Sequence, residues 1–481
     1  MSWPQVLYGG LTRRGPGAVV AAAVVLCLAL GAGAALMSGR VFWLVVVVVS
    51  LAILTVRWPP VGVVVALLAI PLTAWIRRLT GGADAYVEND PLILLPTLAV
   101  CVSLLAARPT GALHTRGARL LLALAVSVSA SGIIGMAGSL TAGAYGLATQ
   151  LVPILLALLL AAGLWPSMWM IAVRTLLVTG PAVGAYGVAQ RFSPTSYDLA
   201  WLLDRQRAIA SIGDPEPGAF RIFGTMESPG PFAFFLALSL LCWLSWGLSH
   251  IADRRYGAAL AGLFPVGVLA LALSVTAVRT ALIAVPISLL VWAGVSRGQN
   301  MVPRLVLVGA LAAAALILPV IVGPTSGGGS SAAARFDPSS IASDVSFQER
   351  ALLLGQFGSA LSRPLGGGVG TTGNATSLAT GTIATVDNGY LSRTLETGPI
   401  GLAVFLVVVL WAARVAKHAM TEGSSWEADA RLLVIIAFLW LDVSGPASAT
   451  AVGMYFWVAV GSALAIPATA TEPARARWIR A

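Results

Sequence analysis

The amino-acid sequence predicts an all-α, polytopic integral membrane protein with about 12 to 14 transmembrane helices. Of the 481 residues, 58% are hydrophobic, and the 29 basic and 19 acidic residues make up only 10% of the chain. Soluble domains are about a quarter charged. The mean hydropathy of +0.89 comes from long apolar runs along the whole chain, without the period-two alternation of a membrane barrel. This composition excludes soluble domains, disordered chains and disulfide-stapled secreted scaffolds.

Fourteen apolar segments are candidates to cross a hydrocarbon core about 30 Å thick. In order, they lie at 18–37, 41–56, 60–76, 91–107, 118–137, 148–164, 168–190, 229–249, 257–278, 280–296, 303–323, 398–416, 430–445 and 449–466. Some have only 16 or 17 residues, so tilted hairpins or partial insertions would lower the count to about 12. The first run is long for a signal-peptide core and further apolar segments follow at once, so we interpret it as a retained helix.

The distribution of basic residues predicts that both termini lie in the cytoplasm. With the N-terminus inside, the cytoplasmic stretches carry 16 basic and five acidic residues, as expected from the retention of positive loops. The net charge of +10 is therefore a topology signal. Basic residues are scattered singly or in pairs between apolar runs and form no stripe for nucleic acid. We expect a location in the cytoplasmic (inner) membrane and no nucleic-acid partner.

The predicted organisation has five parts. They are the N-terminal transmembrane helices at 1–190, an extracytoplasmic loop at 191–228, transmembrane helices at 229–323 with an outer turn at Arg279, a large extracytoplasmic loop at 324–397, and C-terminal helices with a cytoplasmic tail at 398–481. The large loop contains a predicted amphipathic helix from Ser346 to Arg363. Its first residues have capping-box spacing, and its apolar residues recur at the helical period.

Residue types that usually carry chemistry are scarce on the expected outer face. The three cysteines lie in apolar runs and are expected to be buried hydrophobes: Cys27, Cys101 and Cys242. The three histidines lie near cytoplasmic helix ends: His114, His250 and His418. The sequence contains no phosphate-binding loop of the Gly-x-x-x-x-Gly-Lys-Ser/Thr type. We therefore expect no metal site and no cofactor, and we expect acid–base chemistry on the outer face to use Asp or Glu.

Three arginines on the expected outer face are candidates to bind phosphate. Arg221 precedes an apolar helix, Arg279 stands alone between two apolar segments, and Arg350 lies on the predicted loop helix. A planar guanidinium suits bidentate binding of a phosphate group. Alternatively, Arg279 reaches the membrane interface as a snorkelling side chain, and Arg350 belongs to a solvated helix face or a salt bridge.

The end of the large loop supplies the candidate base. Asp387 and Glu396 lie at the expected protein–lipid boundary, together with Asn388 and Tyr390. Partial desolvation there favours a general-base role for a carboxylate. Asn388 is equally consistent with a helix cap, and Glu396 with an ion pair to Arg393. Asp442, near the outer end of its helix, is expected to pair with an arginine.

Four of these outer segments carry motifs of a known family. They are Arg221-Ile222-Phe223-Gly224-Thr225 through Pro229, the turn Thr276-Ala277-Val278-Arg279-Thr280-Ala281-Leu282, the pair Ser346-Phe347-Gln348-Glu349-Arg350 and Arg363-Pro364-Leu365-Gly366, and the pair Asp387-Asn388-Gly389-Tyr390-Leu391 and Glu396-Thr397-Gly398-Pro399-Ile400-Gly401. In this order they resemble the O-antigen ligase and O-antigen polymerase family of membrane glycosyltransferases. The resemblance spans about 220–410. The chain has Asp387 where the family's ligases carry a histidine, which fits a polymerase-like or exopolysaccharide-type member better.

The resemblance implies a metal-independent enzyme without a cofactor on the outer face of the membrane. It would polymerise or ligate glycans from a polyprenyl-diphosphate-linked donor onto a glycan or lipid acceptor, in contact with membrane lipid. Arg221 and Arg279, with Arg350 as a further candidate, would hold the diphosphate. Asp387, or else Glu396, would accept the proton of the acceptor hydroxyl, and Asn388 and Tyr390 would contact other parts of the substrate.

Two alternative functions remain open at the level of the sequence. A transporter or flippase for lipid-linked sugars would explain the helices and a charged cavity equally well. A metal-dependent membrane glycosyltransferase would use Asp84, Glu88 and Asp90, in the loop after the third apolar segment.

Overall fold

The computed structural model describes residues 39–81, 90–107, 115–208, 212–295, 355, 357–381, 384, 386–422 and 425–465. Within this part of the chain it confirms an all-α membrane protein. Regular secondary structure is helical there, and extended pairing is limited to two isolated bridges, Gly213–Phe220 and Gly373–Ala384. The predicted spans at 18–37 and 303–323 lie outside the described residues, as do Cys27 and Arg350.

The helices follow the order of the apolar segments. They are α3 (Gly39–Arg57), α4 (Val61–Ala69), α5 (Thr73–Gly81), α6 (Leu95–Ala106), α7 (Arg116–Gly138), α8 (Leu140–Ala161), α9 (Met168–Phe192), α10 (Ser196–Ala208), α11 (Pro229–Ala252), α12 (Tyr256–Val275), α13 (Arg279–Val295), α17 (Ser377–Thr380), α18 (Gly389–Glu422), α19 (Trp426–Leu441) and α20 (Gly453–Leu464). Short 3₁₀ helices are η2 (Pro91–Leu94), η5 (Asn374–Thr376) and η6 (Ala447–Ala449).

Length and hydropathy define which helices could span a membrane. Seven helices in the described part are long and apolar enough to cross a membrane, or eight if the bent pair α4–α5 is one span. Shorter apolar helices lie at Leu92–Ala106, Arg279–Val295 and Gly453–Leu464. Since two predicted spans lie outside the described residues, the total of about 12 to 14 stays a prediction.

Three predicted spans have different boundaries in the structure. The segment predicted at 148–164 begins earlier, at Leu140, and ends at Ala161. The segment 60–76 is not one helix: α4 and α5 meet at an angle of 66°, and the hydroxyl of Thr225 donates to the carbonyl of Pro71 at the break. The segment predicted at 398–416 begins earlier, at Gly389, and is interrupted at Gly398, where φ is +70°. Hydropathy averaged over a window detects neither break, because both lie within apolar sequence.

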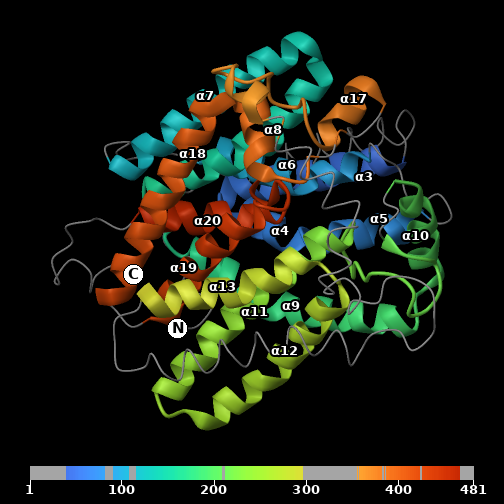
Figure 1. The fold of residues 1–481 in the computed structure, drawn as a ribbon, viewed down its shortest axis with the longest axis vertical. Coiled ribbons are helices and arrows are strands. Elements are labelled where there is room, and N and C mark those ends of the chain that lie inside the picture. Colours follow the sequence, from blue (N-terminus) through green and yellow to red (C-terminus); the bar gives the residue numbers. More distant parts are fainter. Residues whose placement is uncertain are drawn as a thin grey trace.

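The helices pack in groups that meet along α19 and α20 (Figure 1). Helix α7 packs against both α8 and α18, whereas α11 packs against α9, α12, α13 and α19. Helix α20 contacts α8, α9, α18 and α19, and so joins the two groups. Helices α3, α4 and α6 form a further layer against α8 and α9. The core is built from the buried side chains of α11, α19 and α20 together with the inner faces of the other helices.

Candidate functional site

A cavity of about 280 Å³ lies among α5, α6, α8, α11, α18 and α20. Its polar lining residues are Thr73, Arg77, Thr97, Tyr145, Thr149, Gln150, Glu227, Thr372, Asn374, Ser392, Glu396 and Thr450. Apolar residues, among them Ile70, Ile93, Met226, Val452 and Met454, complete the wall. A concave, largely apolar space with a few convergent polar groups is typical of a small-molecule or cofactor site.

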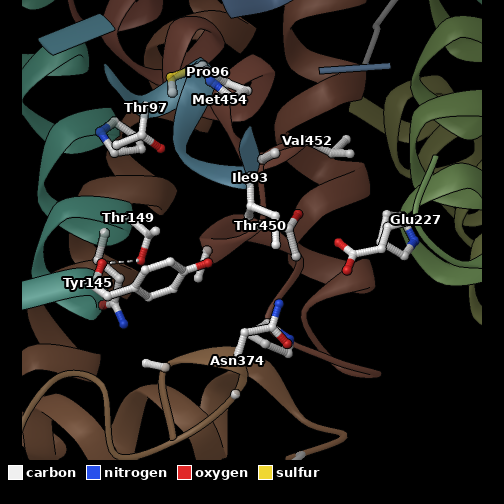
Figure 2. A pocket seen from close by; sticks show the side chains of 18 of the residues that line it. Ile93, Pro96, Thr97, Tyr145, Thr149, Glu227, Asn374, Thr450, Val452 and Met454 are labelled. Carbon is white, nitrogen blue, oxygen red and sulfur yellow. Dashed lines mark hydrogen bonds between the residues drawn. The ribbon is translucent and has the colours of Figure 1, made fainter. Parts of the chain in front are cut away.

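Polar groups from separate segments converge on this cavity (Figure 2). The phenol ring of Tyr145, on α8, reaches in from one side, and the carboxylate of Glu227, in the loop before α11, faces it from the other. Asn374 of η5 and Thr450 before α20 border the space between them. Because these residues are far apart in the sequence, only the folded chain brings the site together.

Glu396 is the predicted site residue that lines this cavity. It is 3% exposed. Its Oε1 accepts the backbone N–H groups of Gly370 (3.0 Å) and Thr372 (3.2 Å), and its Oε2 accepts the side-chain amide of Gln150. Three donors therefore hold the carboxylate in one orientation. The alternative predicted for Glu396 was an ion pair with Arg393. The ion pairs of the described residues do not include this pair.

The glycine-rich turn at 366–370 fixes the main chain at Glu396. The amide of Gly368 donates to the carbonyl of Glu396 (3.1 Å), and the hydroxyl of Ser131 on α7 donates to the same oxygen. A Cβ atom on Gly366, whose φ is +72°, would collide with that carbonyl group. The turn therefore acts through close backbone packing, which larger residues do not allow.

Arg77, on α5, is the cationic side chain among the cavity-lining residues. Its side chain is 1% exposed, and its Nε donates to Asp90 at 2.9 Å. The guanidinium carbon lies 5.1 Å from the centroid of the Trp201 ring, within the range of a cation–π contact. Its Nη1 lies 3.7 Å from Oε1 of Glu227, which is longer than a hydrogen bond. The two side chains are therefore close enough for electrostatic attraction.

The loop that carries Glu227 is anchored on α5 and α10. Arg78 forms a buried ion pair with Asp198 and donates to the carbonyl of Gly224 (2.6 Å). Asp198 also accepts the hydroxyl of Tyr186 (2.8 Å). The indole N–H of Trp201 donates to the main-chain carbonyl of Glu227 (3.1 Å). The predicted extracytoplasmic loop at 191–228 is thus an ordered support for the cavity over its described residues.

The structure brings two of the predicted arginine segments together outside the cavity lining. The Nε of Arg221 donates to the carbonyl of Thr276 (3.0 Å), within the turn that leads to Arg279 at the start of α13. Ala277 in this turn has a φ of +52°, a conformation that is uncommon for a residue with a Cβ atom. The third predicted arginine, Arg350, lies outside the described residues, and the predicted loop helix is helical at 357–361.

Three predicted site residues, Asp387, Asn388 and Tyr390, lie at the start of α18 and differ in their contacts. The side chain of Asn388 accepts the amide of Leu391 (3.0 Å), which is the helix cap considered as its alternative. The hydroxyl of Tyr390 donates to the carbonyl of Leu439. Asp387 is exposed. These three residues do not line the cavity in the described part of the chain, so the roles predicted for them stay predictions.

Arg393 and Asp442 meet at Ser448. The Nη2 of Arg393 donates to the hydroxyl of Ser448 (3.1 Å), and the amide of Ser448 donates to Asp442 (2.9 Å). The guanidinium carbon of Arg393 also lies 3.9 Å from the centroid of the Phe405 ring. Arg393 is therefore the arginine near Asp442, and Ser448 forms a hydrogen bond with each of them.

A metal site at Asp84, Glu88 and Asp90 gains no support at Asp90. Its Oδ2 accepts Arg40 and Arg77, and its Oδ1 accepts the amide of Leu92 (2.9 Å). Asp84 and Glu88 lie outside the described residues. Within the described part of the chain, no cluster of three or more His, Cys, Asp or Glu side chains could hold a metal ion.

Sequence reasoning missed Arg77, Tyr145 and Gln150 as site residues, and it named Glu227 only as part of a motif. Arg77 directly follows the predicted span 60–76, and its position at the end of an apolar segment did not distinguish it from other arginines near helix ends. The available signal was an Arg77-Arg78 pair directly after an apolar run interrupted by Pro71. Tyr145 and Gln150 carry no comparable signal, because polar residues one or two turns apart in an apolar helix are common.

Comparison with protein-family models gives no match, and comparison with curated proteins gives none either. The fold and the cavity therefore define the class on their own. The chain is an all-α, polytopic membrane protein with a cavity lined by arginine, carboxylate, amide and hydroxyl side chains.

Proposed function

We propose that this protein is a membrane glycosyltransferase that polymerises or ligates glycans from a polyprenyl-diphosphate-linked donor. One observation carries the proposal: residues from two of the segments that resemble the family's motifs line a single cavity, and a third such segment leads directly into its lining. The first supplies Glu227, the glycine-rich turn leads to Thr372, and the last supplies Glu396. Motifs that were separate in the sequence thus share one space with a buried arginine.

The electrostatics of the cavity suit an anionic donor. Arg77 presents a guanidinium to the wall, and such a group binds phosphate oxygens with two parallel hydrogen bonds. First-turn residues of α5, α6, α11 and α20 also line the space: Thr73, Pro96, Pro231 and Met454. The N-terminal ends of four helices therefore border the space, and the partial positive charge of helix N-termini favours negative charge nearby.

The predicted topology agrees with a site on the outer face. The arginine distribution assigns the links around 77–90, 138–147, 191–228, 324–397 and 446–448 to that side, and residues in or next to each of them line the cavity. A polyprenyl-linked donor exposes its glycan there. Since the diphosphate already activates the anomeric carbon, direct displacement needs no nucleotide, in keeping with the missing phosphate-binding loop.

Deletion of the protein followed by analysis of lipid-linked glycans and surface polysaccharide tests this proposal. Accumulation of single lipid-linked repeat units indicates a polymerase, and accumulation of long lipid-linked chains indicates a ligase. Normal surface polysaccharide with no accumulated lipid-linked glycan would overturn the proposal.

The broken span α4–α5 favours a second candidate, a transporter of lipid-linked sugars. Discontinuous helices next to a central site are common in secondary transporters, and Ile70, Thr73 and Arg77 at this break line the cavity. The same deletion separates the two candidates, since loss of a flippase leaves lipid-linked glycan on the cytoplasmic face of the membrane.

A further inference from the structure

We infer that Arg77 and Glu227 are the reacting pair of the cavity, with Glu227 as the general base and Arg77 as the ligand of the leaving diphosphate. This inference rests on the proposed function and assigns its chemistry to residues other than Asp387, Arg221 and Arg279. It follows from how each cavity-lining charge is held.

Arg77 is oriented before any substrate arrives. Asp90 accepts its Nε (2.9 Å), and the ring of Trp201 lies against its guanidinium. These contacts fix one edge and one face of the planar group. Its Nη1 lies 3.7 Å from Glu227, and both residues belong to the lining of the cavity. A guanidinium that is already oriented loses little entropy when it binds a phosphate.

Glu227 and Glu396 differ in how accessible their carboxylates are. This matters because a general base needs an oxygen atom that the substrate can reach. Glu396 is 3% exposed and receives three hydrogen bonds, from Gly370, Thr372 and Gln150. The side chain of Glu227 is 25% exposed and lies 3.7 Å from that of Arg77. Glu227 therefore has the accessible carboxylate, and Glu396 has the structural one.

The main chain of Glu227 is fixed, which a base also requires. The indole of Trp201 donates to its carbonyl, and two residues earlier the hydroxyl of Thr225 donates to Pro71. Trp201 thus contacts both members of the pair, because its ring also lies against Arg77. Through Trp201, the pair connects α5, α10 and the loop before α11.

The reaction step balances with these two residues. The oxygen of the acceptor hydroxyl forms a bond to the anomeric carbon, and its proton moves to the carboxylate of Glu227. The bond from that carbon to the diphosphate oxygen breaks, and the diphosphate leaves with the electron pair. Glu227 becomes neutral as the leaving group gains charge, so Arg77 exchanges one anionic partner for another. The number of charges around the guanidinium is unchanged, which avoids the cost of an unpaired buried charge.

Two measurements on the purified protein in lipid nanodiscs test the pair. The first is turnover of lipid-linked glycan extracted from the deletion strain. Glu227→Gln is expected to lower turnover by about 10²- to 10⁴-fold, and Glu227→Asp to retain part of it. Asp253→Asn, at the far end of α11, is the matched control and is expected to leave turnover unchanged.

The second measurement is binding of radiolabelled farnesyl diphosphate. Arg77→Gln is expected to weaken binding about 10- to 100-fold, and Arg255→Gln serves as its control. Glu227→Gln is expected to bind at least as tightly as the wild-type protein, because the substitution removes a competing anion.

The outcomes separate the inference from the proposed function. A wild-type protein that makes no glycan product overturns the proposed function, whatever the variants do. A wild-type protein that turns over, with Glu227→Gln equally active or Arg77→Gln binding farnesyl diphosphate normally, overturns the inference alone. Loss of binding as well as turnover in Glu227→Gln would indicate a structural role and would also overturn it.

Discussion

At the scale of single residues, the cavity contains two carboxylates with different surroundings. Glu396 is enclosed by hydrogen-bond donors, whereas Glu227 is partly exposed beside Arg77. A carboxylate enclosed in this way orders the groups around it, because each donor is satisfied only while the anion is present. We therefore expect the two residues to respond differently to the same change of Glu to Gln.

Glu396→Gln is expected to lower the stability of the protein by about 1 to 3 kcal/mol. The new amide group would place a donor opposite Gln150 or opposite the backbone N–H groups of Gly370 and Thr372, and one buried donor would lose its partner. Thermal unfolding in nanodiscs measures this change. Glu216→Gln, at an exposed site, is the control, and equal melting temperatures for both variants would contradict the expectation.

Arg279 tests whether the turn that Arg221 contacts takes part in the reaction. Because this turn lies outside the cavity lining and Arg77 is assigned the diphosphate, Arg279→Gln is expected to keep product formation. Glycan product is measured in membranes that contain equal amounts of inserted protein. Loss of product in normally inserted Arg279→Gln would place part of the donor at this turn and contradict the assignment of the diphosphate to Arg77.

Residue types in the sequence predicted part of this site and no more. Glu396 and the glycine-rich turn were recognised from motif spacing, whereas the cap at Asn388 was only the alternative to the predicted substrate contact. Arg77 was not recognised, because its role depends on Asp90 and Trp201. The spacing of residues along the sequence does not reveal contacts between distant segments.

At the scale of elements, two breaks in the helices shape the cavity. The bend between α4 and α5 brings Arg77 to the wall. The interruption at Gly398 separates the segment that carries Glu396 from the long apolar part of α18. Both breaks lie beside proline, at Pro71 and Pro399, whose missing N–H disrupts a helix. The sequence contained this signal, but the apolar surroundings favoured continuous spans.

Gly398→Ala is expected to destabilise the protein by about 1 to 3 kcal/mol. Gly398 has a φ of +70°, and a Cβ atom there would collide with the carbonyl of Pro364. Gly267→Ala in α12, where an added Cβ meets no atom within 4 Å, is the matched control and is expected to be neutral or slightly stabilising. Thermal unfolding compares the two, and a smaller loss for Gly398→Ala than for the control would contradict the strained turn.

Asp198→Ala is expected to cost about 3 to 5 kcal/mol, because it leaves Arg78 as a buried charge without its anion. The loss would detach α10 from α5. Asp204→Ala, on the same helix, is the control. Hydrogen exchange of α10 amides reports the local effect, and unchanged protection in Asp198→Ala would show that the ion pair does not hold this helix.

At the scale of the whole molecule, composition predicted the all-α membrane class and most helix positions. It did so because burial in lipid requires long apolar helices regardless of their packing. Composition did not predict that the links expected on one side of the membrane converge on one cavity. That convergence depends on α19 and α20, which pack against both helix groups.

Glycan transfer is expected to be insensitive to metal chelation. Asp90 is occupied by Arg40, Arg77 and the amide of Leu92, and the proposed displacement uses only protein side chains. Turnover in nanodiscs with and without EDTA measures this property. A loss of activity that added Mg²⁺ or Mn²⁺ restores would favour the metal-dependent alternative.

The most direct test of the central claim is the fate of the donor lipid. Lipid-linked glycan from the deletion strain is incubated with the purified protein in nanodiscs, and the lipid products are separated by mass. The account predicts release of polyprenyl diphosphate together with an equal amount of extended or transferred glycan, and loss of both products in Glu227→Gln. Donor that remains intact in the presence of the wild-type protein and acceptor would contradict it.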